Sequence, residues 1–459
     1  MKIINSILLI VFLNACQSTV ENPSSSLPSS SLPSNSAERE QLEKKIAQYP
    51  KDTVSLNLLT AMQSKEYQKT GNLTLLNKAI ASFNELIKRQ PFNDNAVFQL
   101  YRLNILKGFL TGTYDISHWQ NFYQQYPYLQ SIDIAPPEYM KVLLSSKDSL
   151  SDDELIDILQ NTLLVNPNFI NAYIKLADIY VEKNKPRLAL FTLESAVKHS
   201  PNNMDVLGLL NVLRMDRISD KHCQLDTSTS LNKAFTDYKK LVKAFPDDAY
   251  NHMQLSNVLL FMGRSQMSLF SIRKAAALSK EYQIDLLHAQ FSSNTKALAK
   301  YFQNKTLHTL NAEELYLYML LNLVNFNWSE TANLVEEYIK HEDITFYGIL
   351  YGAYAYKILG QEHMAENIIN QGLSKIKIKP WQQEMLNFAQ NKTSSEKLVA
   401  ISANNCELTE AYFIQSLKQI HLGEMTEAQK NMEKILELNI YPFTEYSIAK
   451  NIIKRLNTN

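Results

Sequence analysis

Hydrophobic residues recur with helical spacing along most of the chain after Ser36, whereas the alternation typical of strands is scarce. The clearest segment is 170–201, INAYIKLADIYVEKNKPRLALFTLESAVKHSP. Its apolar residues fall on one face of a first helix and then on one face of a second, and Pro201 closes the pair. These residues are Tyr173, Leu176, Ala177 and Tyr180, followed by Ala189, Leu193 and Ala196. The pattern predicts two helices joined by a short turn.

The same pattern recurs along the chain. Similar segments occupy 249–280, 346–377 and 409–440. Degenerate helix pairs are expected at 94–127, 136–167, 281–306 and 380–403. The final helix, 443–457, has no expected partner, so we predict that it is a polar cap of the array.

Small residues and prolines keep fixed places in these segments. The prolines Pro50, Pro91, Pro127, Pro167, Pro201 and Pro246 are 34–45 residues apart, and Gly263, Gly360 and Gly423 fall at matching positions. The segments resemble the tetratricopeptide repeat (TPR), a 34-residue helix-turn-helix unit. The resemblance implies an all-α fold, a right-handed superhelical solenoid of about ten or eleven helix pairs over 37–459. A generic helical bundle would not require such fixed positions.

The first residues carry a different signal. Lys2 precedes a short apolar run that is too short to span a bilayer, which is typical of a signal peptide over 1–15. The run ends Leu-Asn-Ala-Cys, which resembles the bacterial lipobox. The resemblance implies that Cys16 is acylated and becomes the mature N-terminus. Gln17 then favours the outer membrane, with the periplasmic face preferred over the cell surface. The alternative is an ordinary signal peptide with an incidental cysteine.

Residues 16–36 are expected to form a tether between the acylated Cys16 and the helical array. The stretch 17–36 contains nine Ser and three Pro, with PSSSL repeated at Pro23 and Pro28. Such a composition offers no apolar surface to bury, so it predicts an extended, solvated segment.

Composition argues against several classes of function. Lys+Arg and Asp+Glu both number 46, and this balance argues against nucleic-acid binding. Only 10 of 459 residues are glycine, and the sequence contains no GxGxxG, P-loop, HExxH or GxSxG motif. We therefore expect neither an enzyme nor a bound cofactor.

The two remaining cysteines, Cys223 and Cys406, are 183 residues apart, or about five repeats. Each pair of helices advances an array by about 8–10 Å, whereas a disulfide needs Cα atoms within about 7 Å. We therefore predict two free thiols. About eleven extra residues separate the helices of the repeat that starts at Met204, and 216–230 is expected to be a surface loop. Its potential metal ligands lack the usual pair spacing, so no metal site is predicted; they are Asp216, Asp220, His222, Cys223 and Asp226.

Aromatic residues are concentrated at 114–128. Trp119 and Phe122 occupy positions where the TPR pattern places core residues. Packing inside a degenerate repeat is therefore favoured over a ligand platform.

The resemblance also indicates a binding face. In TPR arrays the first helices line the concave side, and repeat positions 2, 6 and 9 point inward. The candidate partner-binding residues are Tyr347, Tyr351 and Tyr354, and then Tyr250, Gln254 and Asn257. Ala353 and Tyr356 are expected to point into the helix pair. Two further triplets fit a solvated helix face equally well: Asn95, Gln99 and Arg102, and Asn171, Lys175 and Asp178.

The favoured hypothesis is a membrane-anchored TPR scaffold or adaptor that binds other envelope proteins or peptides. Related lipoproteins assist pilus assembly, recruit cell-wall hydrolases or serve polysaccharide export, and the sequence does not choose among these settings. The alternative is an enzyme or enzyme activator with an unrecognised catalytic segment. No non-repeat segment exceeds about 40 residues, which is short for a catalytic domain.

Overall fold

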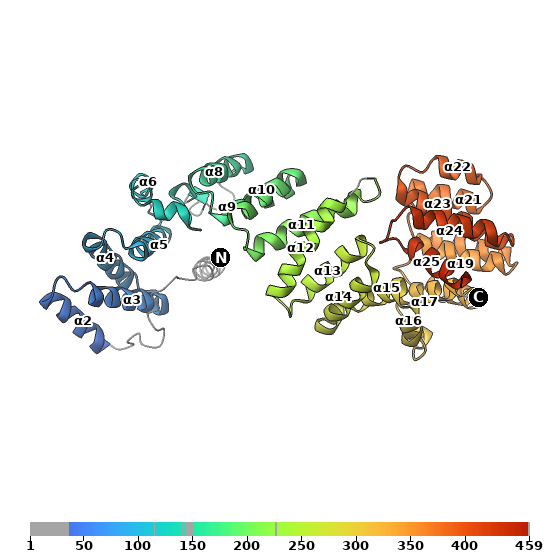
Figure 1. The fold of residues 1–459 in the computed structure, drawn as a ribbon, viewed down its shortest axis with the longest axis horizontal. Helices are drawn as coiled ribbons and strands as arrows, with labels where there is room; N and C mark the ends of the chain where they lie inside the picture. The colour runs from blue at the N-terminus through green and yellow to red at the C-terminus, as the bar shows by residue number, and fades with distance from the viewer. Residues whose placement is uncertain (1–35, 114, 140, 143–149, 225–226, 458–459) are drawn as a thin grey trace. The chain divides into compact units, whose positions relative to one another are not determined.

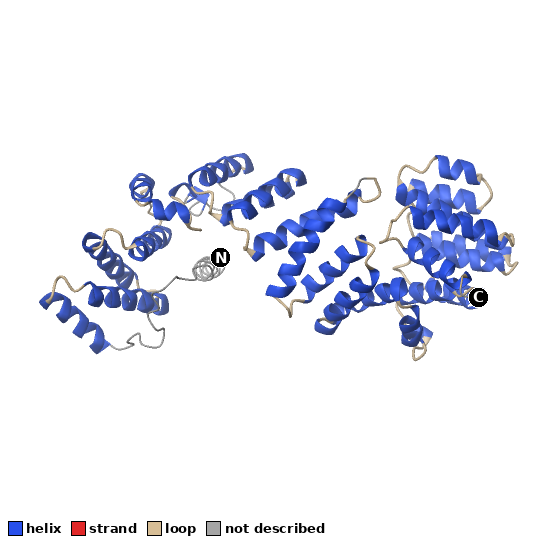
Figure 2. Ribbon diagram, viewed as in Figure 1, coloured by secondary structure: helices blue, strands red, loops and turns tan. Residues whose placement is uncertain are grey.

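The computed structural model describes residues 36–113, 115–139, 141–142, 150–224 and 227–457. These residues form helices joined by short turns, and no strand occurs among them (Figure 2). The all-α fold is therefore confirmed. None of the helices in these ranges is both long and apolar enough to cross a bilayer. The predicted signal peptide, the acylated Cys16 and the tether up to Asn35 lie outside the described residues.

The described residues divide into two compact units, one up to Val206 and the other from Leu207 onward. The N-terminal unit, blue to green in Figure 1, contains α2 (Ser36–Gln48), α3 (Thr53–Thr70), α4 (Leu73–Arg89), α5 (Asp94–Thr111), α6 (Ile116–Gln125), η1 (Pro127–Ser131), η2 (Pro137–Tyr139), α8 (Asp152–Val165), α9 (Ile170–Glu182) and α10 (Pro186–His199). Helices α3 and α4, and helices α9 and α10, pack as pairs. The helices predicted at 170–201 are thus confirmed.

Local sequence explains where these helices begin and end. The Asp52 carboxylate accepts the backbone N–H of Ser55 and starts α3, while Gly71 adopts a left-handed conformation and ends it. Ser151 and Glu154 form a capping box at the start of α8. Helix α8 supplies the second helix of the pair expected at 136–167.

The aromatic segment of the N-terminal unit packs in its core. Tyr101 of α5 is fully buried, with the rings of Trp119 and Phe122 at 5.9 Å and 6.2 Å from its own. Both side chains pack against the main apolar cluster of this unit. The predicted core role of Trp119 and Phe122 is therefore confirmed, while Tyr114 lies outside the described residues.

The C-terminal unit contains most of α11 (Met204–Lys221), then α12 (Ser228–Ala244), α13 (Ala249–Phe261), α14 (Ser265–Leu278), η3 (Lys280–Tyr282), α15 (Gln283–Ser293), α16 (Thr295–Phe302), η4 (Leu307–Thr309), α17 (Ala312–Val324), α18 (Trp328–Tyr338), α19 (Phe346–Ile358), α20 (Glu362–Leu373), α21 (Pro380–Ala389), α22 (Ser395–Ala400), α23 (Asn405–His421), α24 (Met425–Glu437) and α25 (Thr444–Leu456). Consecutive helices pack pairwise, as α13 with α14, α17 with α18, α19 with α20 and α23 with α24. The degenerate pairs expected at 281–306 and 380–403 are present as α15/α16 and α21/α22.

The turn inside many of the helix pairs contains a left-handed residue. Glycine provides it at Gly263, Gly360 and Gly423, where φ is +71°, +72° and +80°. The same turn uses Phe326 at φ 59° in the α17/α18 pair and Asn391 at φ 60° in the α21/α22 pair. The recurring glycines of the sequence therefore mark the turns between paired helices.

Two glycines of α19 allow close packing against α18. A Cβ atom at Gly348 would lie 2.4 Å from the Tyr338 ring, and one at Gly352 would lie 2.3 Å from Val335 Cγ2. No side chain can occupy that space, so glycine permits the helices to approach at these two positions.

The last helix, α25, packs against helices that are distant in the sequence. It contacts α15, α17 and α23 as well as its neighbour α24. The Asn451 side chain donates to the Phe291 carbonyl of α15 over 3.0 Å. The apolar face of α25 is fully buried and comprises Ile448, Ala449 and Ile452. The expectation that segment 443–457 has no partner helix is therefore wrong, because the winding of the C-terminal unit brings the earlier helices back beside α25.

Candidate functional site

The tyrosine stripe of α19 lies inside the C-terminal unit. Tyr351 and Tyr354 are only 3% and 2% exposed, and Tyr347 is half-buried. Helix α23 packs on α19, and α25 packs on α23. The prediction that Tyr351 and Tyr354 lie on an accessible binding face is wrong, because later helices cover that face. Ala353 and Tyr356 are buried, as predicted.

The α19 stripe contributes to a buried polar cluster. The Tyr347 hydroxyl donates to Glu410 Oε1 of α23 over 2.8 Å, and Trp381 Nε1 donates to Glu410 Oε2 over 2.5 Å. The Tyr351 hydroxyl donates to Glu445 at the start of α25. These bonds join α19, α21, α23 and α25 around two carboxyl groups, so the hydroxyls of Tyr347 and Tyr351 have partners within the protein.

Burial changes the acid–base properties of this cluster. Desolvation, and secondly the nearby Glu445 carboxylate, raise the pKa of Glu410 to about 8. Desolvation also raises the pKa of Glu445 and holds the pKa of Tyr351 well above its usual range. Hydrogen bonds from the phenols and the indole oppose the shifts of the two carboxyl groups. The cluster therefore favours neutral groups, as expected for structural contacts inside a core.

The α13 face remains at the surface. Tyr250 is 40% exposed, and its hydroxyl accepts a hydrogen bond from Gln254 Nε2 over 2.9 Å. Asn257 is half-buried and its side-chain amide donates to Met253 Sδ over 3.1 Å. One helical stripe thus presents a phenol and two amides, each held by a neighbour along the same helix.

Two helices of the N-terminal unit also present polar residues at their surfaces. On α9, Lys175 and Asp178 are exposed and Asn171 is half-buried. On α5, Asn95 is exposed and Gln99 is half-buried. These positions agree with a solvated helix face and add no contact that specifies a ligand.

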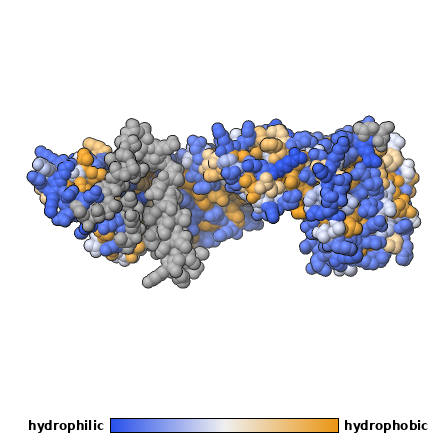
Figure 3. Space-filling model, turned by 90° about the horizontal axis from the view of Figure 1, so that it is seen from below, coloured by the Kyte–Doolittle hydropathy of each residue, from blue (hydrophilic) through white to orange (hydrophobic). Residues whose placement is uncertain are grey.

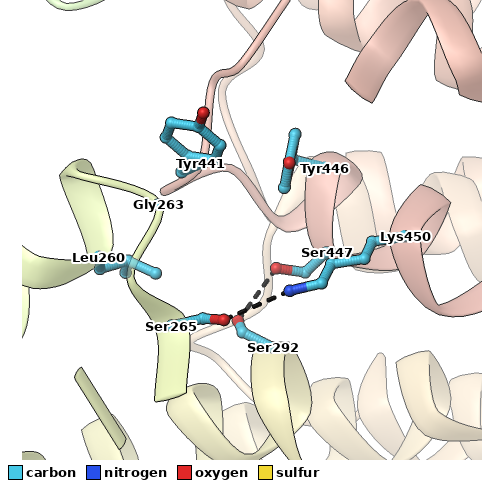
Figure 4. A pocket seen from close by; sticks show the side chains of 8 residues that line it. All are labelled: Leu260, Gly263, Ser265, Ser292, Tyr441, Tyr446, Ser447 and Lys450. Atoms are coloured by element: carbon cyan, nitrogen blue, oxygen red, sulfur yellow. Dashed lines mark hydrogen bonds between the residues drawn. The ribbon is translucent and has the colours of Figure 1, made fainter. Parts of the chain in front are cut away.

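A small pocket lies where α25 meets the α13–α14 turn and α15 (Figure 4). Lys450 Nζ donates to Ser265 Oγ over 3.3 Å, and Ser447 Oγ donates to Ser292 Oγ over 3.0 Å. Its polar groups therefore bond across the pocket to one another. The pocket is part of the packing of α25.

The cysteines Cys223 and Cys406 form a disulfide, with their Cα atoms 5.2 Å apart. The prediction of two free thiols is wrong because it assumed that each repeat moves the chain farther from the earlier ones. In the C-terminal unit, the winding of the chain instead brings residues 183 apart into contact. The turn after α11 meets the start of α23, where Asn405 N–H also donates to the Cys223 carbonyl over 3.1 Å. This contact joins segments 183 residues apart within the C-terminal unit.

The insertion predicted as a surface loop at 216–230 is mainly helical. Helix α11 continues to Lys221 and α12 starts at Ser228, while residues 225–226 lie outside the described ranges. The extra residues lengthen α11 to 18 residues, against 13 in α13. The longer helix carries Cys223 to its partner, so the insertion contributes a cross-link.

Sequence reasoning missed Glu410 and Glu445, although the sequence contains a signal for both. Glu445 precedes Ile448 and Ile452 at helical spacing, and Glu410 likewise precedes Phe413 and Leu417 on α23. A carboxylate in line with an apolar stripe indicates a buried charge that needs hydrogen-bond donors.

Most of the surface around α17–α25 is hydrophilic on the face shown in Figure 3. Most of the large apolar side chains of this region are buried in one continuous cluster that runs from α15 to α25, and the exposed ones are isolated residues such as Leu359 and Leu422. The polar stripe of α13 is therefore a more specific candidate for partner binding than an apolar patch on these later helices.

No protein-family model and no curated protein sequence matches the chain. Solved structures with similar helices include a tetratricopeptide repeat protein from Parabacteroides merdae ATCC 43184, with 12% identity, 70% of this chain and 99% of that chain covered, and a TM-score of 0.33. The TPR domain of P58(IPK) has 11% identity, coverage of 91% and 92%, and a TM-score of 0.29.

A third similar structure is YrrB, described as a TPR protein with an unusual peptide-binding site. Its identity is 13%, its coverage is 55% of this chain and 98% of that chain, and its TM-score is 0.24. The paired helices of this chain, with a left-handed residue in many of their turns, form TPR-like helix-turn-helix repeats.

Proposed function

We propose that this protein is a non-catalytic scaffold that binds extended segments of other proteins on the α13 face formed by Tyr250, Gln254 and Asn257. The observation that carries the proposal is the 40% exposure of Tyr250, while the equivalent stripe of α19 is covered by its own chain. Tyrosine offers a large contact area at low conformational cost, which suits a binding surface.

The hydrogen bonds of this face prepare it for an extended chain. Gln254 donates to the Tyr250 hydroxyl, which leaves that hydroxyl's own proton for an acceptor on a partner. The amides of Gln254 and Asn257 each have a carbonyl oxygen that can accept a backbone N–H. A partner with free backbone groups, such as a peptide segment, matches these donors and acceptors.

We further propose that Cys16 is acylated and anchors the protein to the outer membrane, with the array on the periplasmic side. The support is the Leu-Asn-Ala-Cys sequence after a short apolar run, followed by a Ser/Pro-rich stretch. Two acyl chains give stable anchoring where one does not. The partners are then envelope proteins, and pilus assembly, recruitment of cell-wall hydrolases and polysaccharide export are the candidate settings.

Crosslinking in intact cells followed by affinity capture and mass spectrometry tests the α13 face. The triple change of Tyr250, Gln254 and Asn257 to alanine is expected to remove the captured partner, with unchanged helicity and melting temperature. Phe270→Ala is the matched control, because Phe270 is 76% exposed on α14, the second helix of the same repeat. Capture lost equally in both variants, or retained by the triple variant, would contradict the proposal.

The anchor has a separate test. Cys16→Ser is expected to move the protein from the membrane pellet to the soluble fraction without changing its helicity. Recovery of this variant in the outer-membrane fraction would show that Cys16 is not the anchor, and would leave the α13 test unaffected.

A further inference from the structure

A histidine nitrogen lies beside both sulfurs of the Cys223–Cys406 disulfide. His222 Nε2 is 3.6 Å from Cys223 Sγ and 3.7 Å from Cys406 Sγ. The nitrogen and the two sulfurs all lie within 4.8 Å of one another. One imidazole and two sulfurs are the ligand types that thiophilic metal ions prefer. Cys406 is buried while His222 and Cys223 are half-buried, so solvent reaches one side of the cluster.

The other ring nitrogen of His222 fixes the tautomer. His222 Nδ1 lies 2.7 Å from the Ser219 carbonyl oxygen. A carbonyl oxygen only accepts, so in the neutral ring Nδ1 carries the proton and Nε2 presents its lone pair to the sulfurs. A disulfide has no proton to donate to that lone pair. Histidine ligands in metal sites are held by the same kind of bond from their second ring nitrogen to a backbone carbonyl.

Contacts other than the S–S bond hold these residues in place. Asn405 N–H donates to the Cys223 carbonyl over 3.1 Å, and Cys406 N–H donates to the Asn404 side chain over 3.0 Å. The imidazole packs edge-on between two aromatic rings, those of Phe261 and Phe443, at centroid distances of 5.1 Å and 6.1 Å. The backbone of both cysteines and the histidine ring therefore keep supporting contacts when the S–S bond is broken.

We propose that reduction of this disulfide creates a metal site in which the Cys223 and Cys406 thiolates and His222 Nε2 bind one thiophilic d¹⁰ cation, Zn²⁺ or Cu⁺. A dithiol reductant supplies two electrons and two protons, the S–S bond breaks, and the reductant becomes a disulfide. Binding of the cation then displaces the two thiol protons, while the imidazole donates its lone pair without losing a proton. The cation keeps the α11–α12 turn joined to α23 when the covalent bond is absent.

Metal titration of the full chain tests this site. The sequence has three cysteines, and every protein tested carries Cys16→Ser. Cys223 and Cys406 are then the only cysteines that remain to bind a metal. The reduced protein, freed of reductant under anaerobic conditions, is titrated with Zn²⁺ alone or Cu⁺ alone in competition with a chromogenic chelator. Oxidised protein and the Cys223→Ser/Cys406→Ser variant are measured in parallel. Circular dichroism records helicity before and after the metal is added.

Reduced protein is expected to bind one equivalent of one of the two cations about 100-fold more tightly than oxidised protein or the double serine variant. His222→Ala is expected to weaken binding at least about tenfold, which is the lower limit seen when even an outer-shell partner of a ligand is removed. His308→Ala is the matched control, because this histidine side chain is 87% exposed, and should not change binding.

Two results would overturn the proposal. One is equal affinity of the reduced and oxidised proteins for both cations, and the other is wild-type affinity in His222→Ala. If reduction lowers the helicity, its recovery on adding one equivalent of cation supports the site. Failure to recover counts against it, because the three ligands would then not assemble.

Discussion

Removing the Cys223–Cys406 disulfide is expected to destabilise the C-terminal unit strongly. The bond closes a loop between residues 183 apart. A loop of this length restricts the unfolded chain enough to contribute about 5 kcal/mol when the whole loop unfolds together. Helical repeats can also unfold piecewise, and opening of single pairs inside the loop gains less from the cross-link. The estimate of about 5 kcal/mol is therefore the upper limit of the effect.

Urea unfolding followed by circular dichroism measures this contribution. Cys223→Ser, Cys406→Ser and the double variant should lose the same stability, because each change removes the same bond. A dithiol reductant should lower the urea midpoint of the wild type to that of the double variant, which itself should not respond. A wild-type curve that does not move on reduction would refute the reasoning. So would a double variant whose loss of stability equals the sum of the losses of the two single variants.

Three further predictions concern buried side chains and the glycines within helices. Burial raises the pKa of Glu410 to about 8, so the stability from its neutral form is complete below about pH 4.5 and is lost as the pH rises towards 8. Glu410→Gln should therefore flatten the pH dependence of the melting temperature, and an unchanged slope would contradict this. Tyr351→Phe should destabilise the protein by about 1–3 kcal/mol because the buried Glu445 carboxyl group loses the hydrogen bond that the Tyr351 hydroxyl donates. Tyr354→Phe should hardly change the stability, because its buried hydroxyl has no hydrogen-bond partner among the described residues. If Tyr351→Phe and Tyr354→Phe lost equal stability in a urea titration, the role given to the Tyr351–Glu445 hydrogen bond would be contradicted. Gly352→Ala should cost about 1–3 kcal/mol through its clash with the neighbouring helix. Gly208 has open space around it, so Gly208→Ala should increase the stability by about 0.5–1 kcal/mol. Thermal melts of the two glycine variants test this, and a lower melting temperature for Gly208→Ala than for Gly352→Ala would contradict the packing.

The helix pairs were predictable because their signals are local. The spacing of Tyr173, Leu176 and Tyr180 defines one helix face, and Gly263 and Gly360 mark the turns that need a left-handed residue. Each signal depends on residues within one repeat. The sequence therefore predicted the helical class and most helix pairs, including the degenerate ones at 281–306 and 380–403.

Contacts between distant repeats were not predictable in this way. Tyr351 and the surface residue Tyr250 both lie on the helix face formed by repeat positions 2, 6 and 9. They differ in exposure only because α23 and α25 pack over the α19 face. The separation of Cys223 and Cys406 likewise suggested a large distance, because the winding of the C-terminal unit depends on small angles accumulated over many helix pairs. Such angles leave no local pattern in the sequence.

Photocrosslinking at single positions tests the central claim most directly. A photoreactive amino acid is placed at Tyr250 in one variant and at Tyr351 in another, and cells are irradiated with the native envelope intact. Because Tyr250 is exposed and Tyr351 is covered by the protein's own helices, a partner should be captured from position 250 and not from position 351. Capture from position 351 with none from position 250 would show that the stripe on α19 is the binding face and that the assignment to α13 is wrong.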